Sequence, residues 1–208
     1  SFLSSEGLPY AIRSDRNSRL ITSIGTVKSS YMVPFSMLSG VSAFDRKWPT
    51  LIVEIRGLRE FSATQIKEML KTSWPSLTTV TVDAEFGGQK GEKTAEHLAR
   101  ALDLEPNRKI LADAIKPYLK GQKAVGLPPI LGIQCSVEAV NDLEQKLGVP
   151  VFEIPCLPPA APGVRLKETF ERGLDKKGVI RLGNAQMGTI TQEQDGGFTI
   201  DLSSDFMV

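Results

Sequence analysis

The sequence predicts an α/β protein with a mainly parallel sheet and helices on both faces. In the middle of the chain, short apolar segments alternate with amphipathic ones, and TLIVEI (50–55) is short, apolar and β-branched, as a buried strand should be. Strands separated by helices need right-handed crossovers, which cover both faces of a parallel sheet. Both ends of the chain instead indicate β-hairpins. We therefore expect an α/β core at 50–177, with β ribbons at 1–49 and 178–208.

A β-hairpin is predicted for RLITSIGTVKSSYMV (19–33). Two β-prone runs meet at Gly25-Thr26, and a glycine at the first position of a two-residue loop suits a type II′ turn. We expect the next segment, PFSMLSGVSAFDRKWP (34–49), to be irregular.

Five amphipathic segments predict helices. They are SATQIKEMLKTSW (62–74), TAEHLARALDL (94–104), NRKILADAIKPYLKG (107–121), VEAVNDLEQKLG (137–148) and GVRLKETFERGLDKKG (163–178). Ser62 and Ser136 are the expected N-caps, and Gly121 and Gly148 the expected stops. Pro117 should kink its helix or begin a looser last turn. The expected apolar faces are Ile66, Met69, Leu70 and Trp74; Ala95, Leu98 and Leu102; Ile110, Leu111, Ala114, Ile115 and Leu119; and Leu166, Phe170 and Leu174.

Further strands are expected at LTTVTVDAEF (77–86), AVGL (124–127) and PVFEIP (150–155). The end of the chain, VIRLGNAQMGTITQEQDGGFTIDLS (179–203), gives three β runs with a Gly-Gly turn. Because neither an internal repeat nor a long linker divides the sequence, we expect residues 1–208 to form one domain, cut from a longer polypeptide.

The composition argues against several classes of function. The formal net charge is +1, and the basic residues are interleaved with acidic ones, so no basic surface for nucleic acid or anionic lipid is expected. Cys135 and Cys156 are the only cysteines and lack metal-site spacing, which favours two buried thiols and no metal. No apolar run approaches the roughly 20 residues of a membrane span.

Two further motifs carry little chemistry. The sequence has no G-x-G-x-x-G, and the glycines of FGGQKG (86–91) have the wrong spacing for a dinucleotide or P-loop site, so a flexible loop is favoured. His97, the only histidine, lies on a predicted helix without a nucleophile motif, so we expect it to be partly exposed rather than catalytic.

The best candidate for a binding site is PCLPPAAPGVRLKETFERGL (155–174). Four prolines stiffen the connection that leaves a strand, and Gly163 and Arg165 lie in the first turn of the next helix, where an anion is favoured. In a parallel sheet this loop would lie outside the carboxyl ends of the strands, where ligands bind. On spacing alone the segment is either an anion site or a stiff loop, and the loop is slightly favoured.

The segment IPCLPPAAPGVRLKETFERGL (154–174) resembles the B subunit of anaerobic glycerol-3-phosphate dehydrogenase, in which a strand leads into a loop of the type LPPSxxGIRL and a helix. Four further segments resemble the same family in the same order. These are LITSIGTVKSSYMVP with a T-x-x-G-T core, TLIVEIRGLREFSATQIKEML, TAEHLARALD and LPPILGI. The likeness is collinear over about residues 19–178. This chain departs from the family where Cys156 replaces a frequent threonine and PAAPG replaces a serine-containing sequence.

The resemblance implies a middle, substrate-side domain that interrupts a two-part FAD-binding domain. The family oxidises sn-glycerol 3-phosphate with a flavin and passes electrons to a membrane quinone through partner subunits. FAD, or FMN, is therefore expected in the full-length protein, and this fragment alone should bind none tightly and be inactive. Arg165, Gly163, Val164, Pro159 and Cys156 would face the substrate or the flavin.

On this interpretation the domain covers the flavin and orients a small phosphorylated polyol. Its partners would be the missing FAD-binding domain of the same chain, possible dehydrogenase subunits and the small substrate, with no nucleic acid. The expected location is the cytoplasm, peripheral at the inner membrane through partner subunits.

Two alternatives stay open. One is a non-catalytic domain that docks subunits, which exposed apolar residues around YMVPFSMLSGVSAF (31–44) or a structural ion pair of a buried Arg165 would favour. The other is a small-ligand binding domain.

Overall fold

The computed structural model describes the whole chain except residues 1, 14, 86–92, 159, 182–184 and 205–208. The predicted loop FGGQKG and Pro159 lie outside the described residues. The chain divides into two compact units, Ser1–Glu171 and Arg172–Val208.

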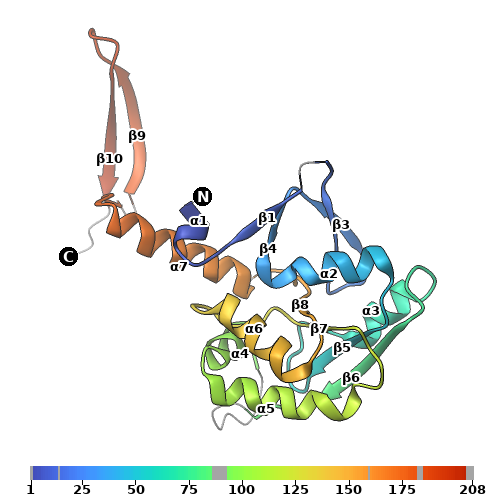
Figure 1. The fold of residues 1–208 in the computed structure, drawn as a ribbon. Coiled ribbons are helices and arrows are strands. Elements are labelled where there is room, and N and C mark those ends of the chain that lie inside the picture. Colours follow the sequence, from blue (N-terminus) through green and yellow to red (C-terminus); the bar gives the residue numbers. More distant parts are fainter. Residues whose placement is uncertain (1, 14, 86–92, 159, 182–184, 205–208) are drawn as a thin grey trace. The chain divides into compact units, whose positions relative to one another are not determined.

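A four-stranded parallel sheet forms the centre of the first unit (Figure 1). Its strands follow the order β6 (Leu77–Val82), β5 (Thr50–Ile55), β7 (Ala124–Leu127) and β8 (Val151–Glu153). The apolar, β-branched strand β5 lies inside the sheet, pairing with β6 and β7, and five of its six residues are buried. The predicted α/β fold with a parallel sheet is therefore confirmed.

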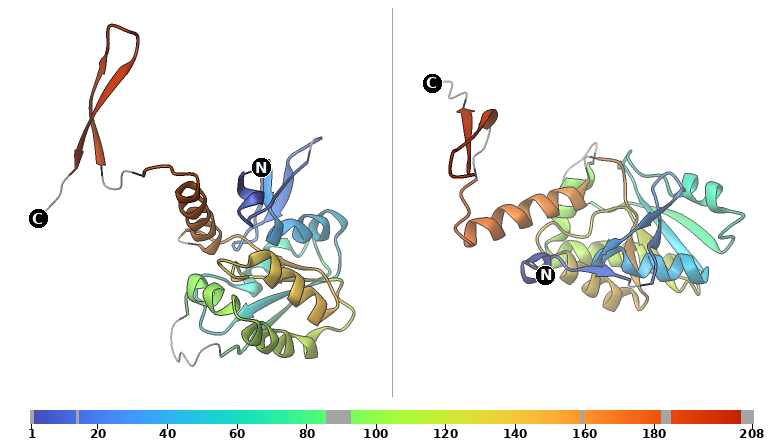
Figure 2. Two further views of the ribbon diagram at one scale, coloured as in Figure 1. Left: turned by 60° about the vertical axis from the view of Figure 1, so that its left-hand side comes forward. Right: turned by 90° about the horizontal axis from the view of Figure 1, so that it is seen from above.

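Helices connect and cover the strands. They are α3 (Ala63–Leu70), α4 (Ala95–Leu102), α5 (Glu105–Ile115) and α6 (Ser136–Leu147), with α2 (Phe35–Arg46) before the sheet and α7 (Ala161–Lys176) after it; a short α1 (Phe2–Ser5) begins the chain. The sheet lies between α2 on one side and α5 on the other (Figures 1 and 2). One large apolar core joins the sheet to its helices and includes the fully buried Ile52, Ile66, Trp74, Leu102, Leu111 and Leu127.

The prediction that residues 34–49 are irregular is wrong, because they contain the twelve-residue helix α2. Gly40 lies in the middle of this helix, where it lowers intrinsic helix propensity. A Cβ at Gly40 would lie 2.5 Å from the ring of Phe152 on β8, so the glycine allows the helix to approach the sheet closely. Tertiary packing therefore outweighs the local sequence here.

The N-terminal ribbon consists of two strand pairs. β2 (Ser18–Ile21) pairs antiparallel with β3 (Val27–Ser30), and β1 (Tyr10–Ile12) with β4 (Met32–Pro34). The hairpin is confirmed, but its type II′ turn is wrong. The Thr22 N–H donates to the Thr26 carbonyl and the Gly25 N–H to the Thr22 carbonyl. These bonds enclose a three-residue loop whose last residue, Gly25, has φ +76°, as in a turn with a G1 bulge.

Most helix signals are confirmed, and five are wrong. Ser62 caps α3, Gly148 ends α6 with φ +71°, and Pro117 lies in a 3₁₀ turn (Lys116–Tyr118) that follows α5. Ser136 is not a cap, because it lies inside the first turn of α6, and Cys135 occupies the cap position without a capping hydrogen bond from the helix to its side chain. Met69, Ile110 and Phe170, expected on apolar faces, are exposed. Gly121 is not a helix stop, because α5 ends at Ile115 and the 3₁₀ turn that follows ends at Tyr118.

The second unit contains the end of α7 and an antiparallel ribbon. The boundary between the units, after Glu171, falls inside α7. Strands β9 (Ala185–Gln192) and β10 (Phe198–Ser204) are joined by a turn that contains the predicted Gly-Gly pair. Residues 179–181, part of the first of the three expected β runs, form no strand.

The hairpin loop packs on α3, and this contact gives a test of the fold. A Cβ at Gly25 would overlap the Cβ of Met69 and lie 3.4 Å from the Ile66 Cα, and the positive φ adds backbone strain. Gly25→Ala should therefore lower the free energy of unfolding by about 2–4 kcal/mol in urea denaturation.

Gly148→Ala is the matched control, because Gly148 has nearly the same φ but nothing within 4 Å of an added Cβ. It should cost only the backbone contribution, about 1 kcal/mol. Equal losses in both variants would show that the hairpin does not pack against α3.

Candidate functional site

Two adjoining cavities lie beside the loop that follows β8. The hairpin-side cavity has a volume of about 330 Å³ and the helix-side cavity about 280 Å³. We call the two together the edge cleft. Both are lined by Ser23 and Ile24 of the hairpin loop and by Leu157 and Pro158 of the loop after β8. The hairpin-side cavity adds Thr22, Thr26, Lys28, Pro155 and Cys156, and the helix-side cavity adds Arg59, Glu60, Phe61, Ser62 and Gln65.

The hairpin loop is fixed against both of its neighbours. The buried Ser23 donates its backbone N–H to the Pro155 carbonyl at 3.0 Å, which links the hairpin to the loop after β8. On the other side Gly25 packs on α3. Within the loop, the hydroxyls of Thr22 and Thr26 are 2.7 Å apart. The T-x-x-G-T sequence therefore forms a held, polar wall of the cleft.

The loop after β8 supplies an apolar lip. Ile154 is fully buried and its N–H donates to the Leu127 carbonyl at 2.8 Å, so the chain leaves the sheet from a fixed point. Further along the loop the side chains turn outward, and Leu157 is 72% exposed. Ile24, across the cleft, is 45% exposed. Exposed aliphatic side chains on a proline-stiffened loop are suited to cover an apolar part of a ligand.

Cys156 lines the hairpin-side cavity as a neutral thiol. Burial raises the pKa of this thiol to about 11, although a hydrogen bond with the Ser23 side chain acts in the opposite direction. At neutral pH the group is therefore protonated and weakly polar, and it is not an activated nucleophile.

Arg165 is buried beneath the loop and bound to Glu153. Its two terminal nitrogens donate to the two carboxylate oxygens of Glu153 at 2.6 Å each, and its Nε donates to the Gly132 carbonyl at 2.5 Å. The Ser36 hydroxyl and the Leu131 N–H complete the set, donating to Glu153 at 2.6 and 2.7 Å. Arg165 and Glu153 are only 2% and 1% exposed, so their charges are neutralised inside the protein.

This ion pair joins four segments: the first turns of α7, the end of β8, the start of α2 and the loop at 131–132. The contact of Arg165 with a substrate or flavin stays a prediction. The ion pair gives the residue a structural role, which is the feature expected of the docking alternative.

The other predicted site residues lie near the start of α7. Gly163 is exposed, while Val164 is half-buried and packs against Ala99, Ile133 and Ala161. Val164 also lines a small cavity of about 140 Å³ with Glu60, Thr94, Ala95, Glu96 and Ala160. Of the predicted site residues that the structure describes, only Cys156 lines the edge cleft.

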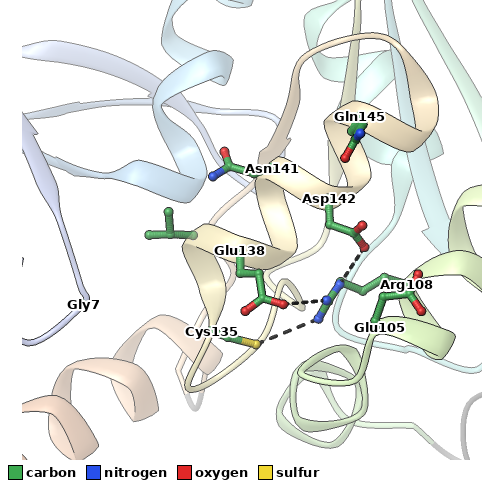
Figure 3. A pocket seen from close by; sticks show the side chains of 9 residues that line it. Gly7, Glu105, Arg108, Cys135, Glu138, Asn141, Asp142 and Gln145 are labelled. Atoms are coloured by element: carbon green, nitrogen blue, oxygen red, sulfur yellow. Dashed lines mark hydrogen bonds and ion pairs between the residues drawn. The ribbon is translucent and has the colours of Figure 1, made fainter.

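A larger hollow of about 670 Å³ lies elsewhere, beside α6 (Figure 3). Arg108 of α5 is 2% exposed in its wall and is held by Glu138 and Asp142 of α6 at 2.9 and 2.8 Å. Burial, with a hydrogen bond to Asp103, raises the pKa of the Cys135 thiol to about 12. The charged groups in this hollow thus have partners already, with Glu105 bound to Lys146 of α6. In the described part of the chain no cluster of His, Cys, Asp or Glu could hold a metal.

His97 is exposed on α4, as expected.

No helix among the described residues is long and apolar enough to cross a membrane.

Sequence reasoning missed the residues that build the cleft's support. Glu153 had a visible signal, because a carboxylate inside the apolar strand VFEI needs a buried partner of opposite charge. Ser36 was hidden in a segment expected to be irregular. Lys28 and the two threonines lie in the predicted hairpin, but only the fold brings them beside residues 155–158.

The role of Arg165 in holding the fold can be measured by urea unfolding. Arg165→Ala leaves the buried carboxylate of Glu153 without its partner, so it should lower the free energy of unfolding by about 3–5 kcal/mol. Arg100→Ala is the control, since Arg100 binds Glu96 and Glu168 at the surface with 44% of its side chain exposed. That variant should lose at most about 1 kcal/mol. Similar losses would contradict the structural role of the buried pair.

The two thiols should resist alkylation in the folded protein. At pH 8, a thiol with a pKa of about 11 is ionised in about one molecule in a thousand, so iodoacetamide should modify Cys156 about 100-fold more slowly than in urea. Because the folded state holds this proton more tightly, stability should fall as the pH rises from about 9 toward 11. Peptide mass spectrometry separates Cys156 from Cys135, and rapid labelling of Cys156 in the folded protein would contradict a neutral, half-buried thiol.

The chain has clear relatives among curated proteins, including B subunits of anaerobic glycerol-3-phosphate dehydrogenase from several organisms. It is 30% identical over 183 residues to the probable one of Halobacterium salinarum, a match that covers 82% of this chain and 42% of that protein. It is 26% identical to the B subunit of Aliivibrio fischeri over 89% of the chain and 42% of the relative, and 26% identical to that of Vibrio cholerae over 78% and 39%. No protein-family model and no solved structure matches the chain.

The chain thus spans less than half the length of these relatives. The similarity nevertheless runs through most of the chain and recurs in proteins of the same name from different organisms. It confirms the resemblance found in the sequence: the chain is homologous to part of the anaerobic glycerol-3-phosphate dehydrogenase B subunit.

Proposed function

We propose that this chain is the substrate-side domain of a flavin-dependent oxidoreductase, which covers the flavin ring and helps to orient a small phosphorylated polyol. The observation that carries the proposal is the edge cleft, formed where two segments that resemble the family, the T-x-x-G-T hairpin and the proline-rich loop, meet. The name of the relatives supports dehydrogenase chemistry on a glycerol phosphate.

The residues of this chain suit contact with the ring of a flavin, but they do not form a site for a whole FAD molecule. No G-x-G-x-x-G occurs in the 208 residues, and cavities of about 280 and 330 Å³ suit a small metabolite rather than a dinucleotide. The FAD would therefore be held by the rest of a longer protein. The apolar lip, formed by Leu157 and Pro158, and Ile24 across the cleft from it are exposed. Together they offer an apolar surface for one face of the flavin ring.

The division of labour follows from this fit. A bound flavin supplies the acceptor for the hydride that leaves the alcohol carbon. The residues of this chain would exclude water from the ring and hold the substrate beside it, with Arg165 and Gly163 supporting the loop or, as the sequence predicts, contacting the ligand. Electrons would then pass to partner subunits and to a quinone.

Absorbance spectroscopy of the purified full-length protein tests the proposal. A bound flavin absorbs at about 450 nm, and anaerobic addition of sn-glycerol 3-phosphate should bleach this band. Leu157→Asp, which places a charge on the lip, should slow the bleaching by about ten- to a hundredfold. Leu104→Asp is the control, because Leu104 is 62% exposed at the N-cap of α5, where aspartate is well tolerated.

A protein without flavin absorbance, or one in which both variants bleach at the wild-type rate, would contradict a role in covering the flavin.

A second function, docking of partner subunits, is favoured by one surface. Tyr31 is 62% and Met32 38% exposed, and Met32 pairs across the strands with Ile12, which is 51% exposed. Tyr31 and Met32 belong to the segment named for the docking alternative, although Val33, Met37 and Val41 of that segment are buried. Co-purification of partner subunits with a protein that lacks flavin would favour this function over the first.

A further inference from the structure

The hairpin-side cavity has a lining suited to an anion. Among the described residues that line it, Lys28 carries the charge, and none is a carboxylate. Thr22, Ser23 and Thr26 supply hydroxyls. Burial raises the pKa of the Cys156 thiol to about 11, so it adds no negative charge at neutral pH. The described lining of the cavity therefore combines a cation with neutral donors and contains no carboxylate, while the charges of Glu60 and Glu153 act on Cys156 from outside this lining.

From this lining we propose that the hairpin-side cavity binds the phosphate group of a small phosphate monoester, with the ammonium of Lys28 as its cation. The proposal rests on the proposed function for the identity of the substrate, a phosphorylated polyol. It adds the location of the phosphate and the residues that bind it.

Lys28 is available for this contact. It lies in β3, opposite Leu20 of β2, and within the described part of the chain its ammonium makes no hydrogen bond or ion pair. An unpaired ammonium offers three N–H donors to phosphate oxygens, and hydrogen bonds between two charged groups are the stronger kind.

The two threonines can donate beside it. Their hydroxyls are 2.7 Å apart, so one hydroxyl proton is shared between them, and the Thr22 oxygen also accepts the Thr26 N–H at 3.3 Å. Two hydroxyls carry two protons, so the pair retains one O–H for a ligand. The same turn holds these groups in place, because Ser23 is bonded to Pro155 and Gly25 packs on α3.

The other cations near the cleft are less suited to the task. Arg165 is neutralised by Glu153 beneath the loop. Arg59 already has an interaction partner, and it lines the helix-side cavity together with Glu60, whose carboxylate would repel an anion. The position of the cation thus separates the two halves of the cleft, with the phosphate in the hairpin-side cavity and the carbon chain toward Leu157.

Calorimetric titration of the full-length protein with sn-glycerol 3-phosphate tests the site. Lys28→Met keeps the apolar stem and removes the charge, and it should raise the Kd by about ten- to a hundredfold. Lys28→Arg should restore binding to within about threefold. Thr26→Val, which has nearly the same shape and leaves the Thr22 hydroxyl in place, should raise the Kd by about three- to tenfold.

Lys67→Met is the matched control, since Lys67 is an exposed lysine on α3 outside both cavities. Unchanged Kd in Lys28→Met, or an equal rise in Lys67→Met, would overturn the proposal. Far-UV circular dichroism checks that the variants at Lys28, Thr26 and Lys67, all of them exposed residues, are folded.

Three further titrations identify the source of the phosphate. Glycerol should show no dependence on Lys28, and inorganic phosphate should show the same dependence as glycerol phosphate. If Lys28→Met instead weakens FMN or FAD and leaves glycerol phosphate unchanged, the phosphate belongs to the cofactor and the substrate assignment is overturned.

Flavin absorbance of the same samples separates this proposal from the proposed function. If the substrate bleaches the flavin but Lys28→Met leaves the Kd of sn-glycerol 3-phosphate unchanged, the phosphate site alone is overturned. Lys28-dependent phosphate binding without flavin would support the phosphate site and overturn the flavin-covering function.

Discussion

Glu153 ends the last strand of the sheet with a fully buried carboxylate, and the guanidinium of Arg165 neutralises it through two parallel hydrogen bonds. A buried carboxylate is costly unless its charge is paired and its oxygens are hydrogen-bonded, and here Ser36 and Leu131 supply further donors. Each donor comes from a different element. The pair therefore determines where α2, α7 and the loop at 131–132 meet the end of β8.

The placement of the edge cleft depends on this junction. Residues 155–158 follow closely after Glu153, and α7 begins four residues before Arg165, so both ends of the proline-rich loop are attached to the same ion pair. A well-packed apolar group of the same size could give as much stability as a buried ion pair. What the planar guanidinium adds is direction, because its two parallel bonds fix the orientation of the strand end relative to the helix.

The regular elements could be predicted because their signals are local. The apolar run at 50–55, the Ser62 cap and the Gly148 stop each act within a few residues, and each is present in the structure. The prediction failed where a distant contact decides the outcome: Gly40 is tolerated in α2 because Phe152 packs against it, and Gly25 is positioned by α3. Helix propensity is a weak preference that such contacts override.

For the candidate site, too, the sequence predicted what local signals determine and missed what distant contacts determine. The composition of the proline-rich loop is a local signal, and Cys156 of that loop does line a cavity. An arginine in the first turn of a helix suits an anion, which favours Arg165 as a ligand contact, but its strongest partner lies on the preceding strand. Glu153 is twelve residues away in sequence. Its carboxylate is buried in an apolar strand and would be costly without a paired cation, whereas a ligand in water is already hydrated, so Glu153 binds the arginine instead.

This competition explains which side chains of the chain can serve a ligand. Buried charges such as Arg165 and Arg108 are bound to carboxylates at 2.6–2.9 Å, so a ligand would have to displace an existing partner from a site with little water. Lys28 and Leu157, in contrast, lie on backbone that is fixed by other residues, and among the described residues their side chains have no hydrogen bond or ion pair to lose. Rigid backbone beneath exposed side chains lowers the entropic cost of binding. For that reason the recognition of a ligand at the edge cleft is best sought in the side chains that the fold does not need.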